Sequence, residues 1–195
     1  MKRKWVMLFS IISASVSLFC FPSRSFSGDY YVFIQPGVYL PQYDNYFLAD
    51  DQFDTGPNVE VVFGKYHNAN IAGELGIGYF QTEGELASSR TQMKEQVFDI
   101  FYTLKGLLPM GPVEIYGGGG FGAYISKASI YPEHEVNTNL GLHVLAGGRF
   151  NINDKLFVGV EGKYLWSSAS FTNGSITDDA QLDGVFVGAH VGVRF

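Results

Sequence analysis

Hydrophobic residues recur at every second position over most of the chain after residue 28, with small or polar residues between them. The last eleven residues show the pattern plainly, because one face carries Val185, Val187, Ala189, Val191, Val193 and Phe195. The other face carries Phe186, Gly188, His190, Gly192 and Arg194. A period of two is typical of a β-strand, whose successive side chains point to opposite sides. The chain is therefore predicted to consist of strands that each have one apolar face.

The alternation predicts eight strands, at residues 29–40, 56–66, 71–82, 93–106, 113–127, 137–150, 155–167 and 181–195. Short connections lie at 67–70, 107–112 and 151–154, and long polar ones at 41–55, 83–92, 128–136 and 168–180. Strands of about ten residues or more can cross a bilayer when tilted, and this alternation of short and long connections is typical of an outer-membrane barrel. We therefore predict an all-β fold, an eight-stranded antiparallel transmembrane up-and-down β-barrel. A ten-stranded barrel, with part of 41–55 paired, is the alternative.

The N-terminus has the features of a secretory signal peptide. Lys2, Arg3 and Lys4 form a basic region, residues 5–21 are apolar apart from serines, and Ser25 and Ser27 place small residues before Gly28. A membrane anchor is the weaker interpretation, because the apolar stretch is short and broken by serines. Cleavage after Ser27 divides the chain into a signal peptide at 1–27 and a barrel domain at 28–195. The mature chain then has no cysteine and forms no disulfide.

Composition and charge agree with a protein whose outer surface faces lipid. Charged residues make up only 16% of the chain, whereas a soluble domain has about 25%. The full chain has a net charge of −6, from 13 basic and 19 acidic residues. Residues 1–27 contain four basic and no acidic residues, so the mature charge is 9 − 19 = −10. Nucleic acid is not an expected partner, because binding it requires basic residues that neutralise phosphates.

The sequence EIYGGGGFGAYI at 114–125 contains the spacing G-x-G-x-x-G at Gly117, Gly119 and Gly122. A dinucleotide-binding loop requires a helix that begins within the glycines. Here the following residues alternate with a period of two instead, so the run is predicted to be part of a strand. Gly118, Gly120 and Gly122 then face inward and leave space for large side chains from neighbouring strands.

The inward face of the predicted strands collects Gln35 and a polar network of Glu60, Glu74, Asp99, Lys105, Glu114, His143, Arg149, Glu161, Lys163, His190 and Arg194. Five carboxylates thus meet four basic groups. One hypothesis is a polar path gated by ion pairs, and the other is a plug that holds the strands in register. The plug is favoured, because side chains just fill an eight-stranded barrel. The outward face carries aromatics expected at the membrane interfaces: Tyr79, Tyr102, Phe150, Tyr164, Trp166 and Phe195.

Together with the signal peptide and the amphipathic strands, the C-terminal Val193-Arg194-Phe195 resembles the small outer-membrane barrels of Gram-negative bacteria. These include the OmpA transmembrane domain, OmpX, the Opa proteins and the OmpW family. The resemblance implies an outer-membrane location, contact with outer-membrane lipid and lipopolysaccharide, and a monomer. Val191, Val193 and Phe195 resemble the signal read by the barrel-assembly machinery, although His190 stands where that signal usually has glycine.

No catalytic residue, cofactor site or metal site is predicted. The nearest approach to an enzyme is His134 with Ser129, Glu133 and Glu135, a set that a lipid-modifying barrel enzyme would need to hold in fixed geometry. The long connections at 41–55 and 168–180 combine aromatic and acidic residues and offer a site for an extracellular ligand. The expected function is therefore a structural or surface-interaction (adhesin-like) role, with the interior closed by ion pairs. A narrow pore for small solutes or ions is the alternative, and a lipid-modifying enzyme the third hypothesis.

Overall fold

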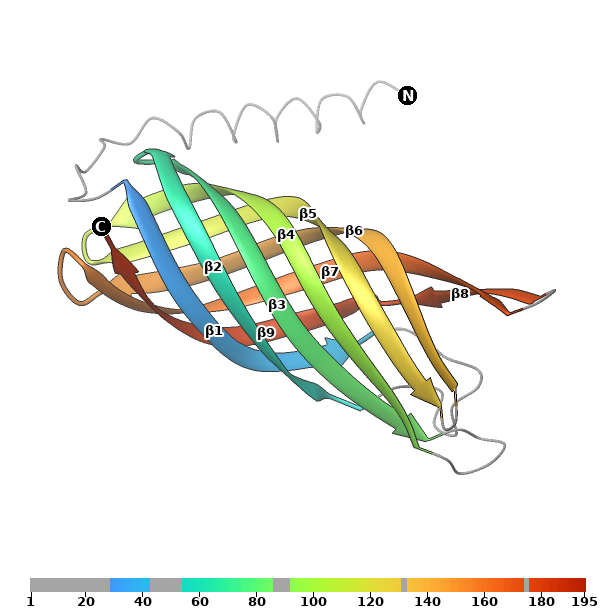
Figure 1. The fold of residues 1–195 in the computed structure, drawn as a ribbon. Helices are drawn as coiled ribbons and strands as arrows, with labels where there is room; N and C mark the ends of the chain where they lie inside the picture. Colours follow the sequence, from blue (N-terminus) through green and yellow to red (C-terminus); the bar gives the residue numbers. More distant parts are fainter. Residues whose placement is uncertain (1–28, 43–53, 86–91, 131–132, 174–175) are drawn as a thin grey trace, which may run out of the picture.

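The computed structural model describes residues 29–42, 54–85, 92–130, 133–173 and 176–195. Nearly all of these residues belong to β-strands that wind around a common axis (Figure 1). No helix that could span a membrane occurs among them. The predicted signal peptide and residues 43–53 of the first long connection lie outside the described residues.

The strands are β1 (Tyr30–Pro41), β2 (Gly56–Asn68), β3 (Ile71–Glu85), β4 (Gln92–Met110), β5 (Val113–Ile130), β6 (Glu133–Asn151), β7 (Leu156–Asn173), β8 (Ile176–Gln181) and β9 (Gly184–Arg194). Each of β1 to β7 pairs antiparallel with the next, and β9 pairs with both β7 and β1, which closes the sheet. β8 precedes β9 along the same edge of β7. The described chain is therefore a closed eight-stranded antiparallel barrel with β8 as an extension, which confirms the predicted fold class.

The predicted connection at 168–180 is wrong. β7 continues to Asn173 and pairs with β8 from Ser168↔Gln181 to Asn173↔Ile176. The ladders likewise continue to Glu85↔Gln92 between β3 and β4 and to Ile130↔Glu133 between β5 and β6. Strands that extend beyond the bilayer need no apolar face, so the hydrophobic period that reveals them in the sequence is lost.

The predicted turn at 107–112 is also too long, because β4 continues through Met110. The reversal uses only Gly111 and Pro112, and Gly111 has a φ of 70°, in the left-handed region that glycine adopts without strain. Leu107 is a buried residue of the ladder rather than part of the turn.

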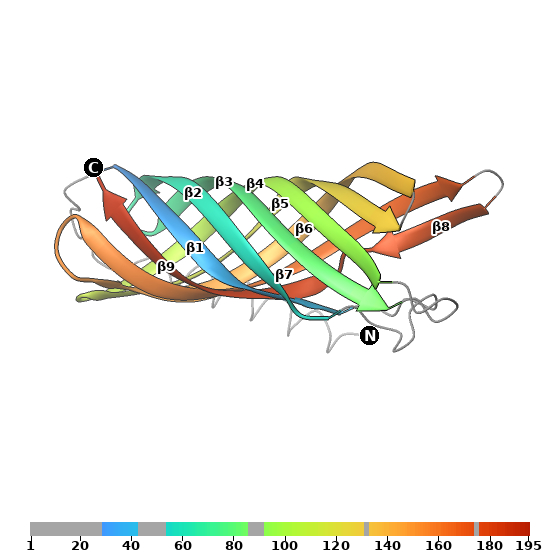
Figure 2. The same ribbon diagram turned by 60° about the horizontal axis from the view of Figure 1, so that its bottom comes forward.

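The two ends of the barrel differ. At one end, called here the turn end, lie the short reversals and both ends of the barrel sheet, where the backbones of Tyr30 and Phe195 exchange hydrogen bonds of 3.2 and 2.9 Å. At the other end, called the arm end, the hairpins extend beyond the barrel as arms. The β7–β8 arm points in a different direction from the others (Figures 1 and 2). This is the asymmetry of an outer-membrane barrel, whose short turns face the periplasm.

Side chains alternate between an exposed, apolar outer surface and a filled interior. In β2 every second residue is buried, and the intervening outward residues include Val59, Val61 and Phe63, each at least 38% exposed. The aromatics predicted to face outward do so: Tyr79, Tyr102, Phe150, Trp166 and Phe195 are exposed, and Tyr164 is half-buried on the same face of β7. The period of two thus distinguished the outer from the inner surface.

Two apolar clusters lie inside the barrel, one near each end. The cluster near the turn end contains Tyr31, Phe33, Val62, Tyr66, Ala72, Phe101, Leu107, Tyr116, Leu145 and Phe157. The cluster near the arm end contains Tyr39, Phe80, Val97, Tyr124, Leu165, Leu182 and Phe186. In the arm-end cluster, the rings of Tyr39, Phe80 and Phe186 contact one another with centroids 4.5 to 5.0 Å apart.

The glycine run lies in β5, which continues as a strand to Ile130, so the helix of a dinucleotide-binding loop is absent from this described segment. A Cβ at Gly120 would overlap the backbone oxygen of Tyr102 and come within 2.9 Å of the His143 ring. At Gly122 it would lie 3.0 Å from the Cβ of Phe101. The inward glycines therefore provide the space that the backbone of β4 and side chains of β4 and β6 occupy.

Gly120→Ala is expected to destabilise the barrel by about 1–3 kcal/mol, because overpacking displaces the neighbouring strand and the His143 ring. The matched control is Gly117→Ala on the outer face of β5, where the nearest atom to an added Cβ is 3.7 Å away. Urea unfolding of both variants in micelles, followed by circular dichroism, measures the difference. Equal stability of the two variants would contradict this account of the glycine run.

Candidate functional site

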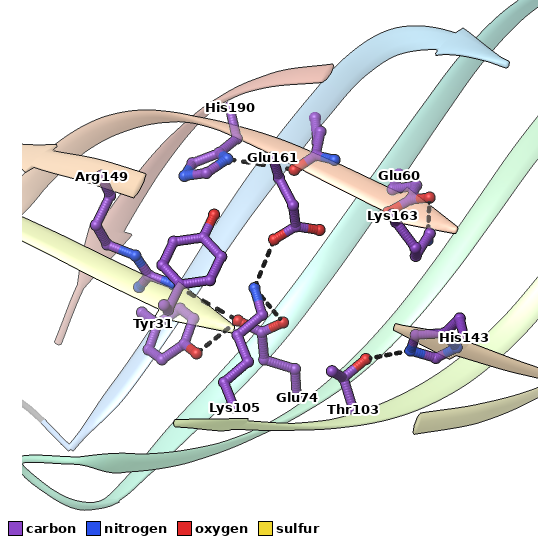
Figure 3. Close-up of polar contacts among 12 residues, drawn as sticks. Tyr31, Glu60, Glu74, Thr103, Lys105, His143, Arg149, Glu161, Lys163 and His190 are labelled. Atoms are coloured by element: carbon purple, nitrogen blue, oxygen red, sulfur yellow. Dashed lines mark hydrogen bonds and ion pairs between the residues drawn. The ribbon is translucent and has the colours of Figure 1, made fainter. Parts of the chain in front are cut away.

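The structure places all eleven residues of the predicted interior network inside the barrel, and none is more than 5% exposed. They come from β2, β3, β4, β5, β6, β7 and β9, and they share the inward phase of the alternation. Gln35 of β1 is buried with them. Several contacts among them join strands that are not neighbours in the wall, such as β4 with β7 and β2 with β7, so these side chains cross the lumen (Figure 3).

Lys105 of β4 lies at the centre of the network. Its Nζ is 2.9 Å from Oε2 of Glu74 on β3 and 2.7 Å from Oε2 of Glu161 on β7 (Figure 3). The same Nζ lies 4.2 Å from the centroid of the Tyr116 ring. One ammonium group thus contacts two carboxylates, and its contact with Glu161 connects β4 with the distant strand β7.

Arg149 of β6 fills the lumen closer to the turn end. Its guanidinium is 3.2 Å from Glu114 Oε1 and 3.7 Å from Glu74 Oε1, and it donates to the Tyr66 hydroxyl at 3.2 Å. Its Cζ also lies 4.8 to 4.9 Å from the ring centroids of Tyr31, Tyr116 and Phe157. A planar guanidinium suits this position, because it stacks on rings while it donates in several directions.

The turn end of the lumen is closed by further polar contacts. Arg194 donates from Nε to the Tyr66 hydroxyl at 3.1 Å and from Nη2 to Asn151 Oδ1 at 2.7 Å. The Tyr31 hydroxyl donates to Glu74 Oε1 at 2.6 Å. Tyr31, Tyr66 and Asn151 are thus partners of the network that the sequence analysis missed. The alternation of inward and outward positions places Tyr31 and Tyr66 inside the barrel, but it does not identify their hydrogen-bond partners.

Toward the arm end, Lys163 of β7 forms an ion pair with Glu60 of β2, again across the lumen. Each histidine has a neutral partner: His143 Nε2 is 2.8 Å from the Thr103 hydroxyl, and His190 Nδ1 is 3.2 Å from Gln35 Oε1 (Figure 3). The histidines therefore join the network by hydrogen bonds rather than by a direct ion pair with a carboxylate.

The structure adds one charged residue to the predicted interior. Glu95 of β4 is only 3% exposed and shares the inward phase of Asp99, four residues further on. The same alternation that selected Asp99 could have found it. The described interior therefore contains six carboxylates, at Glu60, Glu74, Glu95, Asp99, Glu114 and Glu161, and four cations, at Lys105, Arg149, Lys163 and Arg194.

The remaining predicted residues lie apart from this network. Val191, Val193 and Phe195 are 43 to 60% exposed on the outer face at the C-terminus, and their role as an assembly signal stays a prediction. Ser129 pairs with His134 in the β5–β6 ladder, and their side chains lie outside the described part of the structure. Within the described residues, no group of three or more His, Cys, Asp or Glu side chains could hold a metal ion.

Three solved structures share the architecture. Neisserial surface protein A is 15% identical, with a TM-score of 0.64 over 88% of this chain and 100% of that one. OprG from Pseudomonas aeruginosa is 13% identical, with a TM-score of 0.68 over 87% and 97%. Ail, the attachment invasion locus protein of Yersinia pestis, solved with a heparin analogue, is 16% identical, with a TM-score of 0.57 over 86% and 99%. At these identities the likeness shows the fold.

Comparison with curated proteins finds no match. The family model described as outer membrane protein β-barrel domain, in contrast, matches residues 11–195. That range includes every strand of the barrel. The chain is therefore a member of the outer-membrane β-barrel domain family.

Proposed function

We propose that this protein has a structural or surface-interaction role in the outer membrane, with its lumen closed by ion pairs. The observation that carries the proposal is the set of charged contacts across the lumen, between β4 and β7, β3 and β6, and β2 and β7. Each of these cations also lies over aromatic rings. Side chains that already bind one another across an eight-stranded barrel leave little space for a solute.

The route to the membrane follows from the ends of the chain. Residues 1–27 act as a cleaved signal peptide, and Val191, Val193 and Phe195 act as the signal for the barrel-assembly machinery. The outward apolar band then contacts outer-membrane lipid and lipopolysaccharide, with the protein as a monomer. In this orientation the arm end faces the cell exterior.

The arms supply the surface available to an extracellular partner. The β7–β8 arm extends beyond the barrel, and its sequence contains the adjacent acids Asp178 and Asp179. Two proteins with the same fold have names that describe surface exposure and attachment, Neisserial surface protein A and the attachment invasion locus protein Ail. A mature charge of −10 favours a neutral or basic partner over a polyanion.

A narrow ion pore is the second candidate. It is favoured by the position of Lys105, whose Nζ contacts Glu74 and Glu161 at similar distances and could exchange between them. Catalysis has less support, because the set predicted around His134 requires side chains in fixed geometry, and these side chains lie outside the described part of the structure. We therefore propose that the protein is not an enzyme and needs no cofactor.

Wild-type protein and Glu161→Gln are both expected to give silent planar bilayers, because removing one charge leaves the aromatic clusters and the other ion pairs in place. Single-channel recording measures this, and folding of the same samples is checked by faster migration of unheated than boiled protein on SDS gels. Discrete openings that Glu161→Gln alters would overturn the closed lumen and establish the pore.

Lys105→Met is expected to destabilise the barrel by about 3–5 kcal/mol, because two buried carboxylates lose their shared cation. The control Lys127→Met removes an exposed lysine from the neighbouring strand β5. Adding Glu74→Gln and Glu161→Gln to Lys105→Met should recover most of the loss. Urea unfolding in micelles measures all three, and a loss no larger than that of the control would refute the central role of Lys105.

Replacing residues 169–180 by a short turn is expected to leave the barrel folded, since β8 pairs only with β7 among the described strands. Attachment of cells displaying the protein to cultured cell monolayers should fall. The double variant Asp178→Asn with Asp179→Asn keeps the length of the arm and removes two of its charges. It therefore shows whether attachment depends on the charge of the arm or on its length. Unchanged attachment with the shortened arm would remove the surface role of this arm and leave the structural one.

A further inference from the structure

One strand carries basic groups on the outer surface near the turn end. In β2 a run of outward apolar residues ends with Phe63, and Lys65 and His67 follow it on the same face, both exposed. The other described lysines at outward strand positions, Lys94 and Lys127, lie toward the arm end. The change from apolar to basic residues along β2 indicates where the outer surface passes from the lipid chains to the headgroups.

His67 owes its position to an irregularity in the ladder. The β2–β3 register shifts between Tyr66 and Asn68, so His67 is the extra residue of a β-bulge. A bulge bends its strand and can redirect a side chain. Here the His67 ring lies over the neighbouring strand β3, where its Nε2 is 3.1 Å from the position that a Cβ at Gly73 would take.

A tyrosine reaches the same place from β4. Tyr102 pairs with Leu75 of β3 and is 39% exposed, and its hydroxyl lies 2.8 Å from the same Cβ position at Gly73. The ring therefore leans toward the turn end, over a residue without a side chain. Gly73 is buried although it faces outward, because the Tyr102 and His67 rings cover it.

Two polar atoms thus meet over Gly73 without binding each other. Within the described part of the chain, neither the His67 ring nor the Tyr102 hydroxyl forms a hydrogen bond. The hydroxyl can donate through its O–H, and the imidazole through an Nε2–H. Because both atoms lie close to one point, a single group with several acceptor oxygens can accept from both.

Lys65 adds a positive charge beside this pair. It stands directly opposite Gly73 in the β2–β3 ladder, and it forms no ion pair among the described residues. Its Nζ lies 5.3 Å from the centroid of the Tyr30 ring, which stacks with Phe63 and Phe195. An exposed cation–π contact is weaker than a charge-assisted hydrogen bond. Neighbouring strands are only about 4.8 Å apart, so the lysine side chain can turn from Tyr30 to an anion beside Gly73.

The surroundings suit an anion that carries apolar chains. On the side away from the turn, Phe63, Leu75 and Leu104 continue the outward face, each at least 45% exposed. On the other side the short β2–β3 turn begins. Asp29, an exposed acid at the neighbouring end of the chain, forms no ion pair with Lys65. A phosphodiester attached to acyl chains has the charge, the acceptor oxygens and the apolar part that this surface matches.

We infer that the turn end binds the phosphodiester of one glycerophospholipid on the outer surface of β2 to β4, with Lys65, His67 and Tyr102 donating to its oxygens over Gly73. The acyl chains lie along the outward apolar residues of β3 and β4. The inference rests on the proposed contact of the outward band with lipid, but not on the proposed surface role, which concerns the arm end. With the turn end toward the periplasm, this lipid belongs to the inner leaflet of the outer membrane.

The test uses folded protein in maltoside micelles, which contain no phosphate, with dioleoyl phosphatidylglycerol added at increasing mole fraction. Native mass spectrometry counts the lipids that each barrel retains, and wild type should retain one at saturation. Lys65→Gln should weaken binding about tenfold or more, because a charge-assisted contact is lost. The control Lys155→Gln removes an exposed lysine from the β6–β7 turn at the same end and should bind like wild type.

Tyr102→Phe keeps every charge and should weaken binding about fivefold, because one hydrogen bond is lost. This variant separates a built site from general attraction to a basic surface. The inference is overturned if Tyr102→Phe binds like wild type, or if Lys65→Gln and Lys155→Gln lose affinity equally. Equal retention of dioleoylglycerol, which has the same chains without phosphate, would also overturn it. Displacement of the lipid by inorganic phosphate would assign the site to a free anion instead. Each of these failures leaves the surface role unaffected, because that role is tested by attachment.

Discussion

The charge on Lys105 must be neutralised inside a barrel whose outer surface faces lipid, and the arrangement of the lumen depends on how this is done. The ammonium group reaches Glu74 and Glu161 at 2.9 and 2.7 Å, while Glu74 also binds Arg149 and Tyr31. Removing Lys105 leaves the buried carboxylate of Glu161 without its ion-pair partner, which is far more costly than the net gain from the pair itself. The network therefore links strands from opposite sides of the wall into one interdependent unit.

Glycine makes this arrangement possible. Backbone oxygens of β4 and side chains of β4 and β6 occupy the space that a Cβ at Gly118, Gly120 or Gly122 would need. On the outer face of the same strand, Gly117 has no such restriction. The inward positions of the glycine run must be small because neighbouring atoms crowd them. The outward position Gly117 has no such requirement. The filling of the lumen by large side chains therefore depends on the glycines in the wall.

The barrel also has a gradient along its axis. At the turn end, acids and cations are matched and aromatic rings cover the cations. At the arm end, a single lysine serves Glu60 and Asp99, and the wall itself separates between β6 and β7. The buried charges are therefore balanced near the turn end and acidic near the arm end.

Alternation by itself determined the barrel and its two surfaces, because a strand half in lipid must repeat its apolar face at every second residue. It therefore predicted Glu60, Asp99 and Arg149 as interior residues, and it contained the signal for Glu95. It could not find the β7–β8 arm, since strands in water need no apolar face. Only the tertiary structure decided which acid meets which base, because partners such as Lys105 and Glu161 lie on strands that are far apart in sequence and not adjacent in the wall. The register and the curvature of the closed sheet bring them together, and these depend on all strands at once.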